Sequence, residues 1–123
     1  MMRMILFDPN KAFKKPELTM EKIVIVAYKP LPGKTPALEK LIKTHWDVLN
    51  KEGLVSDRKP ILCKAKDGTI VEVFGWKSKE AIESAHANES VQKMWTDYAE
   101  VCEYIPISEV AESMELFSEF MPV

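Results

Sequence analysis

The order of the hydrophobic patterns is the feature that most restricts the fold of this chain. In chain order they are strand-like at 22–29, helix-like at 34–52, strand-like at 58–66 and 69–77, helix-like at 79–103 and strand-like at 114–122. This order, β-α-β-β-α-β, predicts a ferredoxin-like α+β domain. We expect a four-stranded antiparallel sheet in strand order 4-1-3-2, with the helices on one face.

Turn and capping residues support these boundaries. Asp67-Gly68, between two strand-like runs, predicts the turn of a β-hairpin. Ser78 is expected to begin the second helical stretch, and Asn88 with Ser90 predicts a break and a second cap inside it. Pro106 is expected to end the helix.

The first strand predicts that both faces of the sheet need cover. Residues 22–28 are apolar and β-branched at both odd and even positions, whereas an antiparallel strand with one wet face alternates. Two helices suffice for one face. A second copy of the chain is the simplest cover for the other, so we predict a homodimer.

Length and composition exclude several classes of protein. The chain has 123 residues and a formal net charge of −2, with no block of basic residues, so nucleic acid is not an expected partner. No apolar run reaches the roughly 20 residues that span a bilayer. Cys63 and Cys102 lack metal-ligand spacing and are interpreted as reduced thiols, which predicts a cytoplasmic protein.

Residues 1–20 lie outside the repeating plan. They are interpreted as an N-terminal extension to the domain at 21–123. The apolar run Ile5-Leu6-Phe7 within them could add a short edge strand or reach a partner subunit.

The junction between the third strand and the next helix resembles a known family. It reads Val73-Phe74-Gly75-Trp76-Lys77-Ser78-Lys79-Glu80-Ala81-Ile82, followed by Ala85-His86 and Ser90-Val91. This stretch is similar to the antibiotic biosynthesis monooxygenase (ABM)-like family of the dimeric α/β barrel superfamily. The closing residues 115–123 also look like the end of small members.

The resemblance covers about residues 20–123 and implies a dimeric α/β barrel. Members include cofactor-free oxygenases of aromatic polyketides, quinol oxygenases and haem-degrading enzymes. The haem-degrading branch needs an asparagine on the first strand, and strand 22–29 has none. The resemblance therefore implies cofactor-free chemistry on an aromatic or quinone-like molecule.

His45 is the central candidate catalytic residue. It lies between Ile42 and Leu49 on the apolar stripe of the first helix, where a polar ring must find a partner or face a cavity. It could be a general base in a pocket between helix and sheet. Alternatively, it is a core histidine bonded to a backbone carbonyl.

Other candidates are aromatic or titratable. Tyr98 and His86 are further catalytic candidates, and Tyr28, Trp46 and Trp95 are candidates for contacting a flat ligand. The alternative for each is core packing or, for His86, an exposed helix position. Two histidines without a nearby carboxylate or thiolate at ligand spacing do not predict a metal site.

Glu72 shares strand parity with Ile70, Phe74 and Trp76, so its carboxylate faces apolar neighbours. A buried acid is costly unless it is paired. It could be a ligand-binding carboxylate of the site, or it could pair with a lysine across the dimer, such as Lys64 on the adjacent strand.

Two functions stay open. The chain could be a cofactor-free monooxygenase or related small enzyme acting on an aromatic or quinone-like molecule. It could instead be a non-enzymatic small-molecule-binding or structural dimer. An open pocket at His45 would favour the first function, and a closed core the second.

Overall fold

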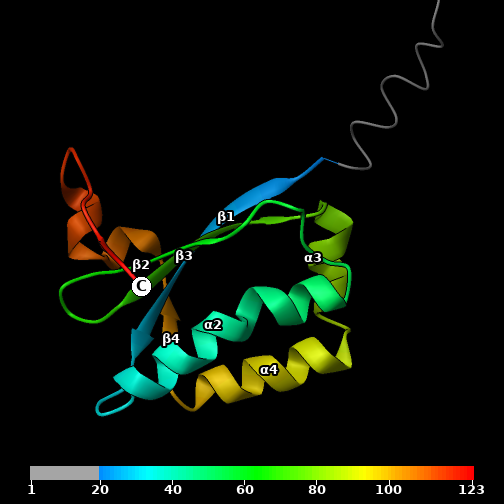
Figure 1. Ribbon diagram of the computed structural model, residues 1–123, viewed down its shortest axis with the longest axis horizontal. Helices are drawn as coiled ribbons and strands as arrows, with labels where there is room; N and C mark the ends of the chain where they lie inside the picture. Colours follow the sequence, from blue (N-terminus) through cyan, green and yellow to red (C-terminus); the bar gives the residue numbers. More distant parts are fainter. Residues whose placement is uncertain (1–19) are drawn as a thin grey trace, which may run out of the picture.

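A five-stranded antiparallel sheet forms the centre of the computed structural model, which describes residues 20–123 (Figure 1). The elements are β1 (Lys22–Pro30), α2 (Thr35–Lys51), β2 (Ile61–Lys64), β3 (Ile70–Trp76), α3 (Lys79–Ala85), α4 (Glu89–Ala99), β4 (Cys102–Ile105) and β5 (Met121–Pro122). Short 3₁₀ turns occupy Ile107–Glu109 and Ala111–Met114. The strand order is β4-β1-β3-β2-β5, and every neighbouring pair is antiparallel.

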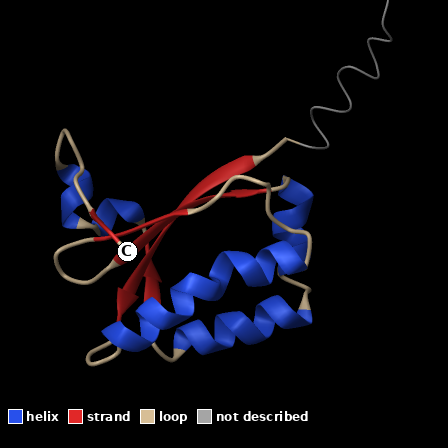
Figure 2. Cartoon of the chain, viewed as in Figure 1, coloured by secondary structure: helices blue, strands red, loops and turns tan. Residues whose placement is uncertain are grey.

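The two longer helices, α2 and α4, lie side by side under one face of the sheet (Figure 2). Leu38, Ile42 and Leu49 of α2 are buried, as are Val91 and Met94 of α4. Their spacing of three, four and seven residues places them on one helical stripe, which packs against β1 and β3. The main core therefore lies between the helices and this inner face of the sheet.

Local turn and cap chemistry confirms several predicted boundaries. Gly68 has φ of 94°, a conformation that glycine adopts without strain, and it closes the β2–β3 hairpin. The N–H of Ala81 donates to Ser78 Oγ at 3.1 Å, so Ser78 caps α3. The N–H of Val91 donates to Asn88 Oδ1 at 3.1 Å, and the predicted helix break lies there.

The C-terminal third differs from the expected four-stranded sheet. Helix α4 ends at Ala99, and Cys102–Ile105, predicted as helix, forms strand β4 instead. The predicted strand at 114–122 is wrong except for the two residues of β5. Because Cys102 and Ile105 stand at helical spacing from Tyr98, the pattern indicated a continuing helix, whereas pairing with Ala27–Pro30 of β1 decides the outcome. The strand beside β1 is therefore β4 and not the predicted strand at 114–122, whose remaining part, β5, pairs with β2 at the opposite edge of the sheet.

The outer face of the sheet, opposite the helices, is half covered. Residues 106–123, which we call the C-terminal arm, pack over the end where β1 finishes. Ala27 and Val71 there form a second apolar cluster with Ala65 and Val110. At the other end Ile23, Ile25 and Ile61 remain 50%, 53% and 62% exposed. The expected need for cover on this face is therefore met by the arm over one half only.

The suggestion that Ile5-Leu6-Phe7 forms an edge strand or reaches a partner concerns residues outside those that the structure describes, as does most of the 1–20 extension. Within residues 20–123, no helix has the length and apolar character needed to cross a membrane.

Candidate functional site

Three buried polar side chains meet in the core between α2 and the sheet. The Tyr28 hydroxyl donates to Glu72 Oε1 at 2.6 Å. His45 Nδ1 lies 2.9 Å from Oε1 and 3.1 Å from Oε2 of the same carboxylate. Glu72 is 0% exposed and His45 is 4% exposed. We call these residues the Tyr–Glu–His network.

Each member comes from a different element. In the β1–β3 register Val26 pairs with Glu72, so Tyr28 stands two residues further along the same face. That face looks toward α2, and His45 lies at the middle of the helix's buried stripe. The sheet register and the helical stripe therefore bring a phenol, a carboxylate and an imidazole to one point.

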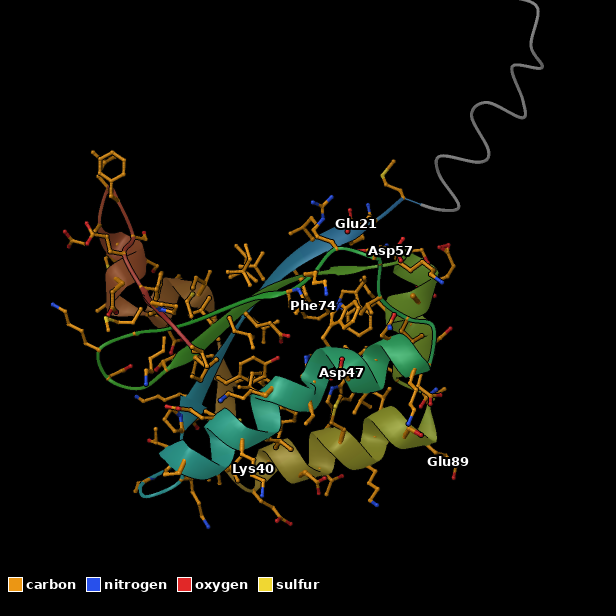
Figure 3. The ribbon with its side chains drawn as sticks, viewed as in Figure 1. Glu21, Lys40, Asp47, Asp57, Phe74 and Glu89 are labelled. Carbon is orange, nitrogen blue, oxygen red and sulfur yellow. The ribbon has the colours of Figure 1, made fainter. Side chains whose placement is uncertain are left out.

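Aromatic rings surround the network. The His45 ring meets the edges or faces of Phe74 and Tyr98 at centroid distances of 5.5 Å for each, with both interplanar angles at 84°. Tyr28 lies 5.4 Å from both Tyr98 and Tyr104. Figure 3 shows Phe74 between the sheet and α2. The site therefore has one polar centre inside an aromatic wall.

Burial and the carboxylate keep the phenols protonated. Desolvation, followed by the charge of Glu72, raises the pKa of Tyr28 well above its usual value. The same two causes, in the same order, raise the pKa of Tyr98. Both phenols are consequently hydrogen-bond donors throughout the neutral pH range.

The pairing also defines the chemistry of His45. To an ionised carboxylate, which only accepts hydrogen bonds, the imidazole would donate Nδ1–H. Nε2 of a neutral ring is then an acceptor, and within residues 20–123 it has no hydrogen-bond partner. A histidine held in one tautomer by a carboxylate is the arrangement that general bases use.

Tyr98 contributes its ring to the site but not a free hydroxyl. Its O–H donates to the carbonyl of Leu41 at 3.2 Å. The Tyr28 hydroxyl is likewise engaged with Glu72. Either phenol could therefore donate to a ligand only after one of these bonds breaks.

His86 lies away from the network. It is exposed at the end of α3, where its Nδ1 lies 3.0 Å from the carbonyl oxygen of Ile82. Its ring stands edge-on to Trp95 at 5.3 Å. The structure therefore groups His86 with Trp95 at the helix surface and does not bring either to His45.

Trp46 follows His45 on α2 and is partly buried against the core. Its Nε1 is buried and has no hydrogen-bond partner among the described residues. An unpaired buried donor is uncommon and costs free energy. Of the three predicted ring contacts, Tyr28 belongs to the network, whereas Trp46 and Trp95 do not.

Glu72 does not have the predicted lysine partner. Lys64 Nζ on β2 binds Glu39 of α2 at 3.1 Å instead. Glu72 faces inward and is satisfied by Tyr28 and His45 within the same chain. Sequence parity located the carboxylate but could not identify its partners, because β1 is apolar at both parities and α2 has no fixed position along the sheet until the chain folds.

The open cavity of the structure lies elsewhere. A groove of about 620 Å³ runs between the β2–β3 turn and the C-terminal arm. Its lining includes Lys64, Lys66, Asp67, Glu112, Phe117 and Met121. Since the side chains of the network are almost wholly buried, the predicted helix–sheet pocket is closed in this conformation.

Within the described part of the chain, no three histidine, cysteine or acidic side chains gather as metal ligands. Comparison of the chain with protein-family models, curated proteins and solved structures found no match.

Proposed function

We propose that this chain is a cofactor-free enzyme, of the ABM-like kind, that acts on an aromatic or quinone-like small molecule. The observation that supports the proposal is the Tyr–Glu–His network, in which His45 is held by a buried carboxylate inside an aromatic wall. Buried titratable groups with specific charge partners concentrate at functional sites.

In this proposal His45 Nε2 removes a proton from an acidic hydroxyl or carbon of the substrate. Glu72 holds the ring in the required tautomer and stabilises the imidazolium that forms. Tyr98 and Phe74 provide faces and edges for a flat ring. The electron-rich anion of the substrate, rather than a group bound by the protein, would then react with oxygen.

Substrate entry requires a conformational change. His45 is 4% exposed, so a ligand reaches Nε2 only when α2, or the side chains over it, move away. Local opening of this kind costs a free energy between about zero and that of global unfolding. A phenolic or quinol substrate also needs a donor, and Tyr98 can provide one if its bond to the Leu41 carbonyl is exchanged for a bond to the ligand.

Oxygen consumption with a panel of hydroquinones, naphthols and anthrones tests the proposal. For any active compound, His45→Ala should lower the rate by roughly 10²–10⁴, the usual contribution of a general base. His86→Ala is the matched control, because it removes an exposed histidine far from the network. Equal rates for wild type and His45→Ala would exclude His45 as the base.

The closed core favours one second candidate, a non-enzymatic small-molecule-binding or structural dimer. All three members of the network already bind one another, and the open groove lies elsewhere. In this case His45→Ala would lower the free energy of unfolding by about 1–3 kcal/mol through the stranded carboxylate. Thermal melts run beside the rate assays separate the two candidates.

We also propose that the chain forms a homodimer through the outer face of the sheet. Ile23 and Ile25 of β1 and Ile61 of β2 support this, since the three half-exposed isoleucines lie on the same face, on either side of β3. Light scattering should give about twice the 14.1 kDa chain mass. Ile25→Glu should give the single-chain mass, whereas Lys29→Glu, on the same strand, should not.

A further inference from the structure

The tip of the C-terminal arm exposes large apolar side chains. Leu116 is 93% exposed, Met114 is 79% exposed and Phe117 is 77% exposed. Met114 ends the second 3₁₀ turn, and Leu116 and Phe117 belong to the loop between that turn and β5, which projects away from the sheet (Figure 1). Three adjacent exposed side chains of this size mark an interaction surface.

The arm and the bare half of the outer face occupy opposite ends of the sheet. The base of the arm covers Ala27 and Val71, near the end of β1. Ile23 and Ile25 lie near the start of β1 and remain half exposed. One chain therefore carries both a projecting apolar element and an uncovered apolar surface that its own arm does not reach.

This arrangement is self-complementary under two-fold symmetry. Two outer faces can meet around a two-fold axis that lies between them and across the strands. Such an axis reverses β1, so the arm of each copy lies over the bare half of the other. Three half-exposed isoleucines alone fall well short of the roughly 800 Å² per partner that stable interfaces bury, and the arms add the missing area.

The arm and the bare end of the sheet also carry opposite net charges. The arm, residues 106–123, contains Glu109, Glu112, Glu115 and Glu119 and no lysine or arginine. The segments at the bare end of the sheet, 20–22, 56–59 and residue 77, contain four basic and two acidic residues. Figure 3 shows Glu21 and Asp57 at this end, far from the arm. Opposite charges would steer the arm onto that end of a second copy.

We propose that two copies of this chain exchange their C-terminal arms, each arm placing Leu116 and Phe117 on Ile23 and Ile25 of the other copy. This inference rests on the homodimer proposed above and identifies what covers its bare surface. Glu115 and Glu119 of the arm then face Lys59, which is exposed at the bare end, and Arg58, whose guanidinium also binds Glu21 of its own chain.

Cross-linking from the arm tip tests this arrangement. The full-length chain carries a photoreactive phenylalanine analogue at position 117. One sample is produced with the ordinary nitrogen isotope and a second with the heavy isotope. The two samples are then mixed, unfolded and refolded together before irradiation. The expected product joins position 117 of one isotope to β1 or β2 of the other isotope. Since about half of the refolded dimers contain two chains of the same isotope, arm exchange would be overturned if mixed-isotope links to β1 or β2 were absent, or if position 117 linked to residues 1–19 instead.

The same experiment separates this inference from the homodimer itself. A dimer by light scattering without mixed-isotope links contradicts the arm exchange alone, whereas a monomer contradicts both proposals. As a second measurement, Leu116→Ser with Phe117→Ser should weaken dimerisation at least about tenfold, the loss expected for central apolar contacts. Ser118→Ala, at the same tip, is the matched control and should leave the dimer unchanged. Since the altered side chains are exposed, thermal melts should stay near those of the wild type.

Discussion

The hydroxyl of Tyr28 donates to Glu72 Oε1 over 2.6 Å, across two neighbouring strands and out of reach of water. A hydrogen bond to a buried charge contributes about 1.5–3 kcal/mol. We expect a double-mutant cycle of Tyr28→Phe and Glu72→Gln, measured by urea unfolding, to give a coupling energy in this range.

Tyr104→Phe is the control for this cycle. Tyr104 is half exposed and its hydroxyl has no hydrogen bond among the described residues. Tyr104→Phe should therefore change the free energy of unfolding by no more than about 0.5 kcal/mol. A coupling energy near zero between Tyr28 and Glu72 would contradict the network.

The tautomer of His45 is a second testable feature. Since the Glu72 carboxylate accepts from Nδ1, a neutral ring should carry its proton on Nδ1. Long-range proton–nitrogen NMR should show this state, and Glu72→Gln should change it. His86 provides an internal reference, because the Ile82 carbonyl also accepts from its Nδ1 and is unaffected by the substitution. A signal from His45 with the proton on Nε2 would contradict the geometry.

The three tyrosines of the chain predict how stability depends on alkaline pH. Desolvation is the largest cause that raises the pKa of Tyr104, to about 12, and it also raises the pKa values of Tyr28 and Tyr98. Below pH 10 both folded and unfolded chains are protonated, so this stabilisation is complete. Above about pH 10, the usual tyrosine pKa, the unfolded chain releases protons that the buried Tyr28 and Tyr98 keep in the fold, and the free energy of unfolding falls by about 1.4 kcal/mol per pH unit for each of these two residues. The half-exposed Tyr104 contributes less.

Tyrosinate absorbance and circular dichroism, followed together, check this prediction. The signals of Tyr28 and Tyr98 should appear only as the fold is lost, and Tyr104→Phe should remove any earlier step. Ionisation of all three near pH 10 in a chain with native circular dichroism would show that the phenols are accessible.

Gly75 lies where an added side chain would displace a neighbouring ion pair. An added Cβ there would overlap the Glu21 carboxylate and lie 2.6 Å from Ser56 Oγ. Glu21 accepts from Arg58 Nε at 3.0 Å, and this bond with that from Ser56 lowers the pKa of Glu21. We expect Gly75→Ala to cost about 1 kcal/mol, the low end for overpacking, because the flexible end of Glu21 can swing away.

The displaced carboxylate provides the readout for this variant. NMR titration should show the pKa of Glu21 returning toward its ordinary value in Gly75→Ala. In a Glu21→Gln background, where no ion pair is left to lose, Gly75→Ala should cost less. An unchanged Glu21 pKa would mean that Gly75 does not seat this carboxylate.

Elements with strong local signals could be predicted from the sequence. Asp67-Gly68 determines the hairpin through its turn conformation, and Asn88 interrupts the helical stretch through its cap. Strand β4 could not be predicted, because Cys102 and Ile105 continue the helical spacing and only the distant partner β1 makes them a strand. The arm was missed for the same reason, since its packing depends on contacts with β1 and β3.

The burial of the site residues could be predicted from the sequence, but their contacts could not. The stripe of α2 predicts that His45 faces the core, and strand parity predicts that Glu72 does so too. Their contact depends on how α2 lies across the sheet, which a single sequence does not encode locally. Tyr28 was harder still, because β1 is apolar on both faces and its parity is not informative.

The same three side chains have a consequence for how the strands find their alignment. A slip of one residue between β1 and β3 would turn either Tyr28 or Glu72 to the opposite face, since side chains alternate along a strand. An apolar strand tolerates such a slip, but a carboxylate stranded without its phenol and imidazole does not. The Tyr–Glu–His network therefore disfavours misaligned β1–β3 pairings and helps to fix the register of β1. The apolar residues of β1 do not distinguish between these pairings.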